Sequence, residues 1–185
     1  MALTMLDPDT ALIIVDLQKG IVGLPTVHPM AGVIERARAL IDAFREHGLP
    51  VVLVNVAGGA PGRTEQPRPI GLRPDDWSDL IPQLDRQPGD IAVTKRTWGA
   101  FASTDLEARL KARGVTQVVI GGVATGTGVE ATARQAYDQG YNVVLVTDAM
   151  TDLDPETHRH AVEKVFPRIG ERTTTAELVA KLKLG

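Results

Sequence analysis

The fold of this chain is decided by one stretch, Val118-Val119-Ile120-Gly121-Gly122-Val123-Ala124-Thr125-Gly126-Thr127-Gly128-Val129-Glu130-Ala131. It starts as an apolar run rich in β-branched residues, breaks into glycines and threonines, and then resumes with the pattern of a helix. This order predicts a strand, a tight turn and a helix that begins near Thr127, because Thr127 and Glu130 fit a capping box. In open α/β sheets ligands bind at such turns, where the first backbone N–H groups of the helix are free.

Strand and helix patterns alternate along the rest of the chain. Apolar runs predict strands at 11–15, 50–56, 90–94, 117–121, 141–146 and 172–174, the fifth of them ending at Thr147-Asp148. Helical spacing and capping residues predict helices at 32–47, 77–84, 104–113, from the turn to about 139, from Asp154 onward, and from Thr174 to about 184. This alternation predicts an α/β three-layer sandwich, in which a mainly parallel sheet of about six strands carries helices on both faces.

Length and composition limit the classes of function. With 185 residues, the chain is expected to form a single domain, residues 1–185. Its net charge of −3 gives no general attraction to nucleic acid or to an anionic membrane. The N-terminus does not resemble a signal peptide and no apolar run is long enough to span a membrane, so a cytoplasmic location is expected. The chain has no cysteine, which excludes disulfides, thiolate metal sites and a cysteine nucleophile.

Two polar residues follow other predicted strands: Asp16 comes directly after the first strand and Lys95 after the third. Because the carboxyl ends of parallel strands share one edge, Asp16, Lys95 and the glycine turn are expected to converge in one crevice. Together they can supply a proton donor or acceptor and a charge stabiliser. Each also has a simpler interpretation: Asp16 as a turn residue, Lys95 as a solvated side chain, and Gly126 and Gly128 as packing glycines.

The turn also fits a different pattern, that of dinucleotide binding. Residues 126–131 match G-x-G-x-x-A, and Asp148 follows at the end of the next strand. However, the motif follows the fourth predicted strand rather than the first, and too little chain remains for a full dinucleotide domain. Asp16 and Lys95 would also have no role, so a crevice that binds a small substrate is the preferred interpretation.

The segment Ala57–Asp76 is rich in glycine, proline and arginine, which predicts an irregular loop that could act as a lid. Candidate binders of a substrate carboxylate, by charge and location, are Arg63, Arg68, Arg73 and Arg96. Trp77 and Trp98 are candidate pocket or interface residues, and ordinary core packing explains them equally well.

Metal and serine-hydrolase patterns are absent from the sequence. The four histidines are expected at the surface, apart from the crevice, and they are His28, His47, His158 and His160. His158 and His160 are two residues apart on a predicted helix and do not share a face. No G-x-S-x-G nucleophile elbow is present. We therefore expect no metal ion and no cofactor.

Three segments resemble the motifs of the isochorismatase-like hydrolase family, also called the cysteine hydrolase superfamily. The first is Ala11-Leu12-Ile13-Ile14-Val15-Asp16-Leu17-Gln18, in which Asp16 stands at the position of the family's catalytic aspartate. The second is Val93-Thr94-Lys95-Arg96 with Gly99-Ala100-Phe101 and Thr104-Asp105-Leu106, and the third is Gly122-Val123-Ala124-Thr125 with Val129-Glu130-Ala131-Thr132-Ala133. The resemblance runs from about Leu12 to Asp148 and implies the family's Rossmann-like fold, with a cis peptide bond between Val123 and Ala124.

The resemblance implies a hydrolase that forms no covalent cysteine intermediate. Amidases of the family carry their nucleophilic cysteine at the position of Gly128, whereas its isochorismatases proper have glycine there and hydrolyse the vinyl ether of isochorismate, giving a dihydroxydihydrobenzoate and pyruvate. By analogy, Asp16 would be the general acid, Lys95 would neutralise a carboxylate or developing charge, and Gly128 would leave room for the substrate. Residues implied to bind the substrate are Gln18, Arg96, Trp98, Val123, Ala124, Thr125 and Thr127.

Other interpretations of the motifs remain open at the level of sequence. The aromatic-Ala-His segment of isochorismatases proper is replaced by Ala124-Thr125-Gly126, and the metal site of the family's nicotinamidases has no counterpart in residues 55–59. A homologue that binds a small molecule without catalysis, or an amidase disabled at Gly128, fits the same motifs. A threonine, Thr125 or Thr127, would be a poor replacement for a thiol nucleophile.

The proposed acid poses an electrostatic question. Lys95 beside Asp16 would lower the pKa of the carboxyl group, so a general acid there requires burial or substrate carboxylates to raise it.

Members of the family commonly form dimers or tetramers, so a homo-oligomer is expected.

Overall fold

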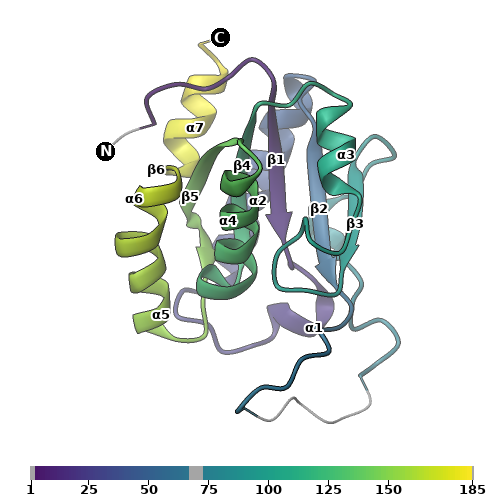
Figure 1. The fold of residues 1–185 in the computed structure, drawn as a ribbon. Helices are drawn as coiled ribbons and strands as arrows, with labels where there is room; N and C mark the ends of the chain where they lie inside the picture. The colour runs from purple at the N-terminus through teal and green to yellow at the C-terminus, as the bar shows by residue number, and fades with distance from the viewer. Residues whose placement is uncertain (1–2, 67–72, 185) are drawn as a thin grey trace.

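The computed structural model describes residues 3–66 and 73–184, which form one six-stranded sheet with helices on both faces (Figure 1). The strands are β1 (Thr10–Val15), β2 (Val51–Val56), β3 (Ile91–Lys95), β4 (Gln117–Val123), β5 (Asn142–Thr151) and β6 (Glu171–Thr173). They lie in the order β3-β2-β1-β4-β5-β6, and every neighbouring pair is parallel. The expected α/β fold is therefore confirmed. Its strand order reverses between β1 and β4, and in open α/β sheets ligands bind at the carboxyl ends of the strands beside such a point.

Successive residues of β1 face opposite sides of the sheet, which creates two apolar cores. Ile13 and Val15 pack beneath α3 (Leu106–Lys111), α4 (Glu130–Asp138) and α6 (Phe166–Ile169). Leu12 and Ile14 face α2 (Met30–Glu46) and α7 (Thr175–Leu182). The remaining helical segments are α1 (Lys19–Val22), η1 (Pro82–Leu84), η2 (Thr125–Val129), α5 (Pro155–His160) and η3 (Ala161–Val165). No helix in the described part of the chain is long and apolar enough to cross a membrane.

Two predicted starts of helices are found where expected. Asp154 accepts a hydrogen bond from the Thr157 backbone N–H at 2.7 Å and is followed by a proline in the first turn of α5. Thr174 and Glu177 form a complete capping box at α7. In both cases short polar side chains satisfy backbone N–H groups that the first helical turn leaves without a partner.

Three predictions on secondary structure are wrong. The segment 77–84 contains only the short η1, and Trp77 lies in a turn before it. A helix, α1, lies between β1 and α2, where the sequence patterns predicted no helix. The strand β5 continues past Asp148 to Thr151, because its register with β4 shifts by a bulge between Ile120 and Gly122. A bulge interrupts the alternation of side chains that locates a strand in a sequence.

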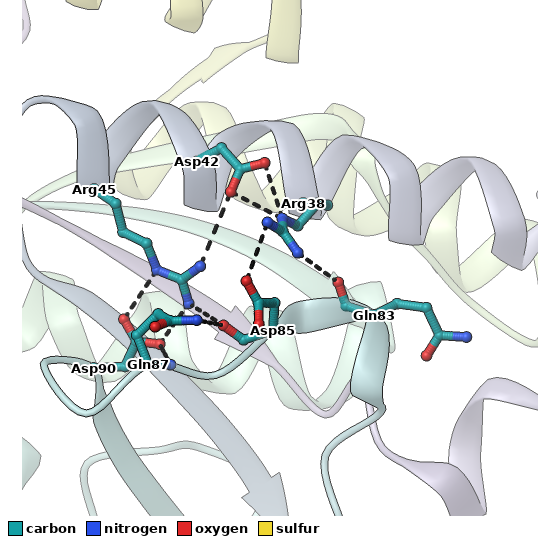
Figure 2. Close-up of polar contacts among 7 residues, drawn as sticks. All are labelled: Arg38, Asp42, Arg45, Gln83, Asp85, Gln87 and Asp90. Carbon is teal, nitrogen blue, oxygen red and sulfur yellow. Dashed lines mark hydrogen bonds and ion pairs between the residues drawn. The ribbon is translucent and has the colours of Figure 1, made fainter.

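A polar network ties α2 to the segment that leads into β3 (Figure 2). Arg45, near the end of α2, contacts both carboxylate oxygens of Asp90, at 3.3 and 2.6 Å, and the Asp85 carbonyl oxygen at 2.9 Å. Asp90 also accepts a hydrogen bond from the Gln87 backbone N–H at 2.8 Å. This network anchors the amino end of β3, at the opposite end of the strand from Lys95.

Candidate active site

The structure brings Asp16 and Lys95 together at the carboxyl ends of the strands. Asp16 directly follows β1 and Lys95 is the last residue of β3, so the lysine side chain reaches past β2 to the aspartate. Lys95 Nζ lies 2.7 Å from Asp16 Oδ2, and both residues are buried. The Asp16 backbone has a φ of 54°, in a left-handed region that non-glycine residues use sparingly and that is enriched at functional sites.

The Asp16 carboxyl group is only half engaged. Oδ2 accepts the hydrogen bond from Lys95, but Oδ1 is buried and has no hydrogen-bond partner within residues 3–66 and 73–184. Burial raises the pKa of Asp16 to about 6, although the charge and the hydrogen bond of Lys95 act in the opposite direction. The carboxyl group can therefore hold a proton in mildly acidic solution, and Lys95 can stabilise the carboxylate that remains when the proton leaves.

Gly128 faces this carboxyl group from the turn after β4. A Cβ atom at Gly128 would lie 3.2 Å from Asp16 Oδ2 and 3.1 Å from the Val123 carbonyl oxygen, closer than most side-chain contacts. Gly128 therefore packs closely against the aspartate, with little room there for a side chain. The peptide bond between Val123 and Ala124 is cis, as the resemblance implies.

The turn after β4 differs from a capped start of a helix. Residues Thr125–Val129 form a wide helical turn, and neither Ala124 before it nor Val129 before α4 provides a side-chain cap. The backbone N–H groups of Thr127 and Val129 both donate to the Ala124 carbonyl oxygen at 3.1 Å. The prediction of a capping box at Thr127 is thus wrong, and these two N–H groups are not free for a ligand, because the wide turn directs them to one carbonyl.

Asp152, directly after β5, holds the same turn from outside. Its Oδ2 accepts a hydrogen bond from the Gly126 backbone N–H at 2.7 Å, and the residue is buried. The Gly126 N–H is therefore the third backbone N–H group of the turn, after those of Thr127 and Val129, that was expected to be free for a ligand and is already bonded.

The predicted substrate-binding residues fall into two groups. Gln18 is fully buried, and its amide group bonds to the Val56 backbone N–H and to the carbonyl oxygens of Val56 and Trp77. These backbone contacts engage both ends of the amide, and the role of Gln18 in binding a substrate stays a prediction. The other group lies in or beside the crevice segments and consists of Arg96, Trp98, Val123, Ala124, Thr125 and Thr127.

Arg96 and Trp98 follow Lys95 and are accessible from solvent. Arg96 is exposed and donates a hydrogen bond to the Ala57 carbonyl oxygen at 3.3 Å, while 67% of Trp98 is exposed. The alternative that Trp98 packs in the core is therefore wrong. Trp77 is half-buried, and the Arg73 guanidinium lies 3.9 Å from the centre of its ring.

The remaining arginine candidates and Asp148 are placed as follows. Arg63 is exposed, and Arg68 lies outside the described residues. Asp148 forms an ion pair with Arg36 at 3.2 Å and accepts hydrogen bonds from the Thr175 N–H and hydroxyl groups. Its engagement with α2 and α7 removes the acidic residue that a dinucleotide site would need.

The sequence interpretation missed two residues of α4 that connect the parts of the site. The Thr132 hydroxyl donates to the Gly128 carbonyl oxygen at 2.7 Å and accepts from the Ala100 N–H at 3.1 Å. Gln135 Oε1 accepts from the Phe101 N–H at 3.0 Å. Through these bonds α4 ties the turn to the loop that follows Lys95. A threonine four residues after Gly128 in a helix was a usable signal, since such hydroxyls commonly bond to that carbonyl.

The sequence interpretation also misplaced one histidine. His158 Nδ1 lies 2.8 Å from the Thr125 hydroxyl oxygen, so this residue adjoins the crevice rather than lying apart from it. The contact joins α5 to a turn far away in sequence, and no local pattern indicates it. Among residues 3–66 and 73–184, no three histidine, aspartate or glutamate side chains gather in a way that could hold a metal ion.

A family model described as the isochorismatase domain matches residues 10–177. The chain belongs to the isochorismatase family. It is 42% identical over 181 residues to the uncharacterized isochorismatase family protein YwoC of Bacillus subtilis (strain 168), and the match covers 94% of each chain. A solved isochorismatase family protein of Burkholderia thailandensis is 39% identical, with a TM-score of 0.92 over 96% of this chain and 97% of that one.

Relatives within the isochorismatase family include amidohydrolases. The ureidoacrylate amidohydrolase RutB of Stutzerimonas stutzeri (strain A1501) is 30% identical over 189 residues, covering 86% of this chain and 76% of the relative. Membership of the family therefore identifies the chain as a hydrolase, and the choice between ether and amide bonds depends on the residues of the site.

Proposed function

We propose that this isochorismatase-family hydrolase cleaves a vinyl ether of a small carboxylated molecule, isochorismate being the first candidate, without a covalent enzyme intermediate. The observation that carries the proposal is the half-engaged carboxyl group of Asp16. It is buried, its Oδ1 has no partner within the described residues, and its pKa is raised to about 6 by burial against the opposing effect of Lys95. Gly128 packs against this carboxyl group without a side chain of its own. These are the properties of a general acid.

In the proposed reaction, Asp16 transfers its proton to the methylene carbon of the enol ether. The ether oxygen then shares the positive charge of an oxocarbenium ion, and water adds to the carbon of that ion. The resulting hemiketal loses the ring alcohol, which leaves a dihydroxydihydrobenzoate and pyruvate. Lys95, at 2.7 Å, stabilises the Asp16 carboxylate until the proton released by the added water restores the acid.

The absence of a nucleophile favours the ether over the amide. The chain contains no cysteine, and the motif resemblance places Gly128 where the family's amidases would carry theirs. Of the two threonines in the turn, Thr125 is fully buried, so its hydroxyl, which bonds to His158, is closed to solvent. No base bonds to the hydroxyl of Thr127 within the described residues. An unactivated hydroxyl is a poor nucleophile. Vinyl-ether hydrolysis needs only a proton donor and water, which the site can supply.

The assay is the release of pyruvate from isochorismate by the purified protein, beside an Asp16→Asn variant of unchanged melting temperature. Release that is lost in the variant supports the proposal. If the wild-type protein releases no pyruvate, isochorismate is not the substrate. Amide hydrolysis that arises in Gly128→Cys would then favour a disabled amidase, and ligand binding without turnover would favour a binding protein.

We also propose the wider setting of this activity. The substrate is a small molecule rather than a nucleic acid or a membrane, the protein works in the cytoplasm as a single domain, and it assembles as a homodimer or tetramer. Trp98 and Arg96, exposed beside the site, are the proposed contacts to the substrate or to a neighbouring subunit. Sedimentation of the wild-type protein and of Trp98→Ala tests the assembly.

A further inference from the structure

A polar cluster outside the catalytic pair surrounds the turn that carries Gly128. The Thr125 residue is fully buried at the start of this turn, and its hydroxyl oxygen lies 2.8 Å from His158 Nδ1. The next residue, Gly126, is bonded by Asp152. A Cβ atom at Gly126 would lie only 2.2 Å from the Thr157 side chain, so α5 packs directly on the turn. Two successive residues of the turn are therefore held by side chains from the segment 152–158.

His158 is itself held in place from the other side. Its ring contacts the ring of His28 edge to face, with 4.7 Å between the centroids. His28 is anchored in turn, because its backbone N–H donates to the Thr151 hydroxyl at 3.0 Å. Burial lowers the pKa of His158, and the neighbouring His28 lowers it further, against the raising effect of Asp152. The imidazole is thus neutral at neutral pH, and it contacts Thr125 as a hydrogen-bonding group rather than as a charge.

We propose that His158 is a positioning residue of the active site, which acts through Thr125 to fix the turn that sets Gly128 against Asp16. The chain of contacts is short. His158 bonds to Thr125, the turn Thr125–Val129 carries Gly128, and Gly128 borders the Asp16 carboxyl group. Thr132 fixes the far end of the turn by its bond to the Gly128 carbonyl oxygen, so His158 and Thr132 hold the turn from both sides.

The role in catalysis rests on the proposed function, but the positioning itself is measurable without a substrate. Hydrogen exchange of the Thr127 and Val129 amides, which bond to Ala124, reports on the rigidity of the turn. In His158→Phe the Thr125 hydroxyl loses its partner, and we expect these amides to exchange about tenfold faster. His158→Asn keeps a polar group near the position of Nδ1 and is expected to restore much of the protection.

His160 provides a matched control on the same helix. It is exposed, and no hydrogen bond, ion pair or ring contact engages its side chain within the described residues. His160→Phe is therefore expected to leave the exchange of both amides unchanged. Equal exchange in wild type and His158→Phe would overturn the proposal, and so would equal acceleration by the two histidine variants.

A second pair of variants covers the case in which His158→Phe does not fold. Thr125→Val removes the hydroxyl at constant shape and is expected to accelerate exchange as His158→Phe does, whereas Thr125→Ser keeps the hydroxyl and the protection. Because both positions act through one bond, the double variant should show little more than either single change. Additive effects would contradict the proposal.

If the wild-type protein releases pyruvate from isochorismate, the same variants give a second readout. Displacement of the turn is expected to lower kcat about tenfold or more in His158→Phe with little change in KM, because the reacting groups lose their alignment. A rise in KM alone would overturn the positioning role. If the wild-type protein is inactive on isochorismate, the proposed function fails while hydrogen exchange still decides the role of His158.

Discussion

The two ends of strand β3 carry the same kind of interaction, an aspartate paired with a cation, with opposite consequences. At the amino end, Asp90 accepts hydrogen bonds on both oxygens, from Arg45 and from the Gln87 backbone (Figure 2). At the carboxyl end, Lys95 engages one oxygen of Asp16 and leaves the other buried without a partner in the described structure. A carboxylate bonded on both oxygens serves the fold. A half-bonded one is available to exchange a proton.

The largest expected effect distinguishes these two aspartates by activity. Asp16→Asn should reduce the release of pyruvate at least about a hundredfold, because the amide cannot supply the proton. Asp90→Asn should keep the activity of each folded molecule. Steady-state rates, corrected for the folded fraction measured by circular dichroism, compare them, and equal losses in both variants would remove the distinction.

The next effect concerns pH. A general acid must be protonated, and the pKa of Asp16 is raised to about 6, so kcat/KM should fall above about pH 6, by about tenfold for each further pH unit. Lys95 lowers this pKa by its charge and hydrogen bond, so Lys95→Met should move the fall to higher pH. A rate profile between pH 4 and 9 measures both; a profile that rises through pH 6 would show that Asp16 acts as a base.

A smaller effect is expected on stability at the amino end. Arg45→Met removes two contacts to Asp90 and should lower the free energy of unfolding by about 1–3 kcal/mol. Arg38→Met, whose side chain is more exposed at 37% against 20%, is the matched control and should cost about 0–1 kcal/mol. Urea unfolding gives both values, and a greater loss in Arg38→Met would contradict this ranking.

The smallest expected effect on stability comes from adding one methyl group at the carboxyl end. In Gly128→Ala the new Cβ would lie 3.1 Å from the Val123 carbonyl oxygen and 3.2 Å from Asp16 Oδ2 and must displace one of them slightly. We expect a loss of about 1 kcal/mol in the free energy of unfolding, together with reduced turnover. Unchanged turnover would mean that the close packing of Gly128 against Asp16 is not needed for catalysis.

Local sequence patterns predicted the sheet and the meeting of Asp16 with Lys95. Buried parallel strands are continuous apolar runs, and their carboxyl ends must share an edge, so two polar residues at strand ends are brought together by topology alone. The patterns did not predict the wide turn at Thr125, because its N–H groups are satisfied by a carbonyl and by Asp152, which lies after the next strand. They also missed His158, whose role depends on the packing of α5. Contacts between segments distant in sequence leave no periodic signal.

The strand order has a further consequence for how the protein would lose its activity. Strand β3 lies at the edge of the sheet and pairs with β2 alone in the described structure, yet it carries Lys95 at one end and follows Asp90 at the other. An edge strand can open locally at a lower free energy than the rest of the sheet. Fraying of β3 would withdraw the lysine while the core stays intact. The protein should therefore lose its activity in mild denaturant before it unfolds. The bonds between Arg45 and Asp90, at the opposite end of β3, should delay that loss.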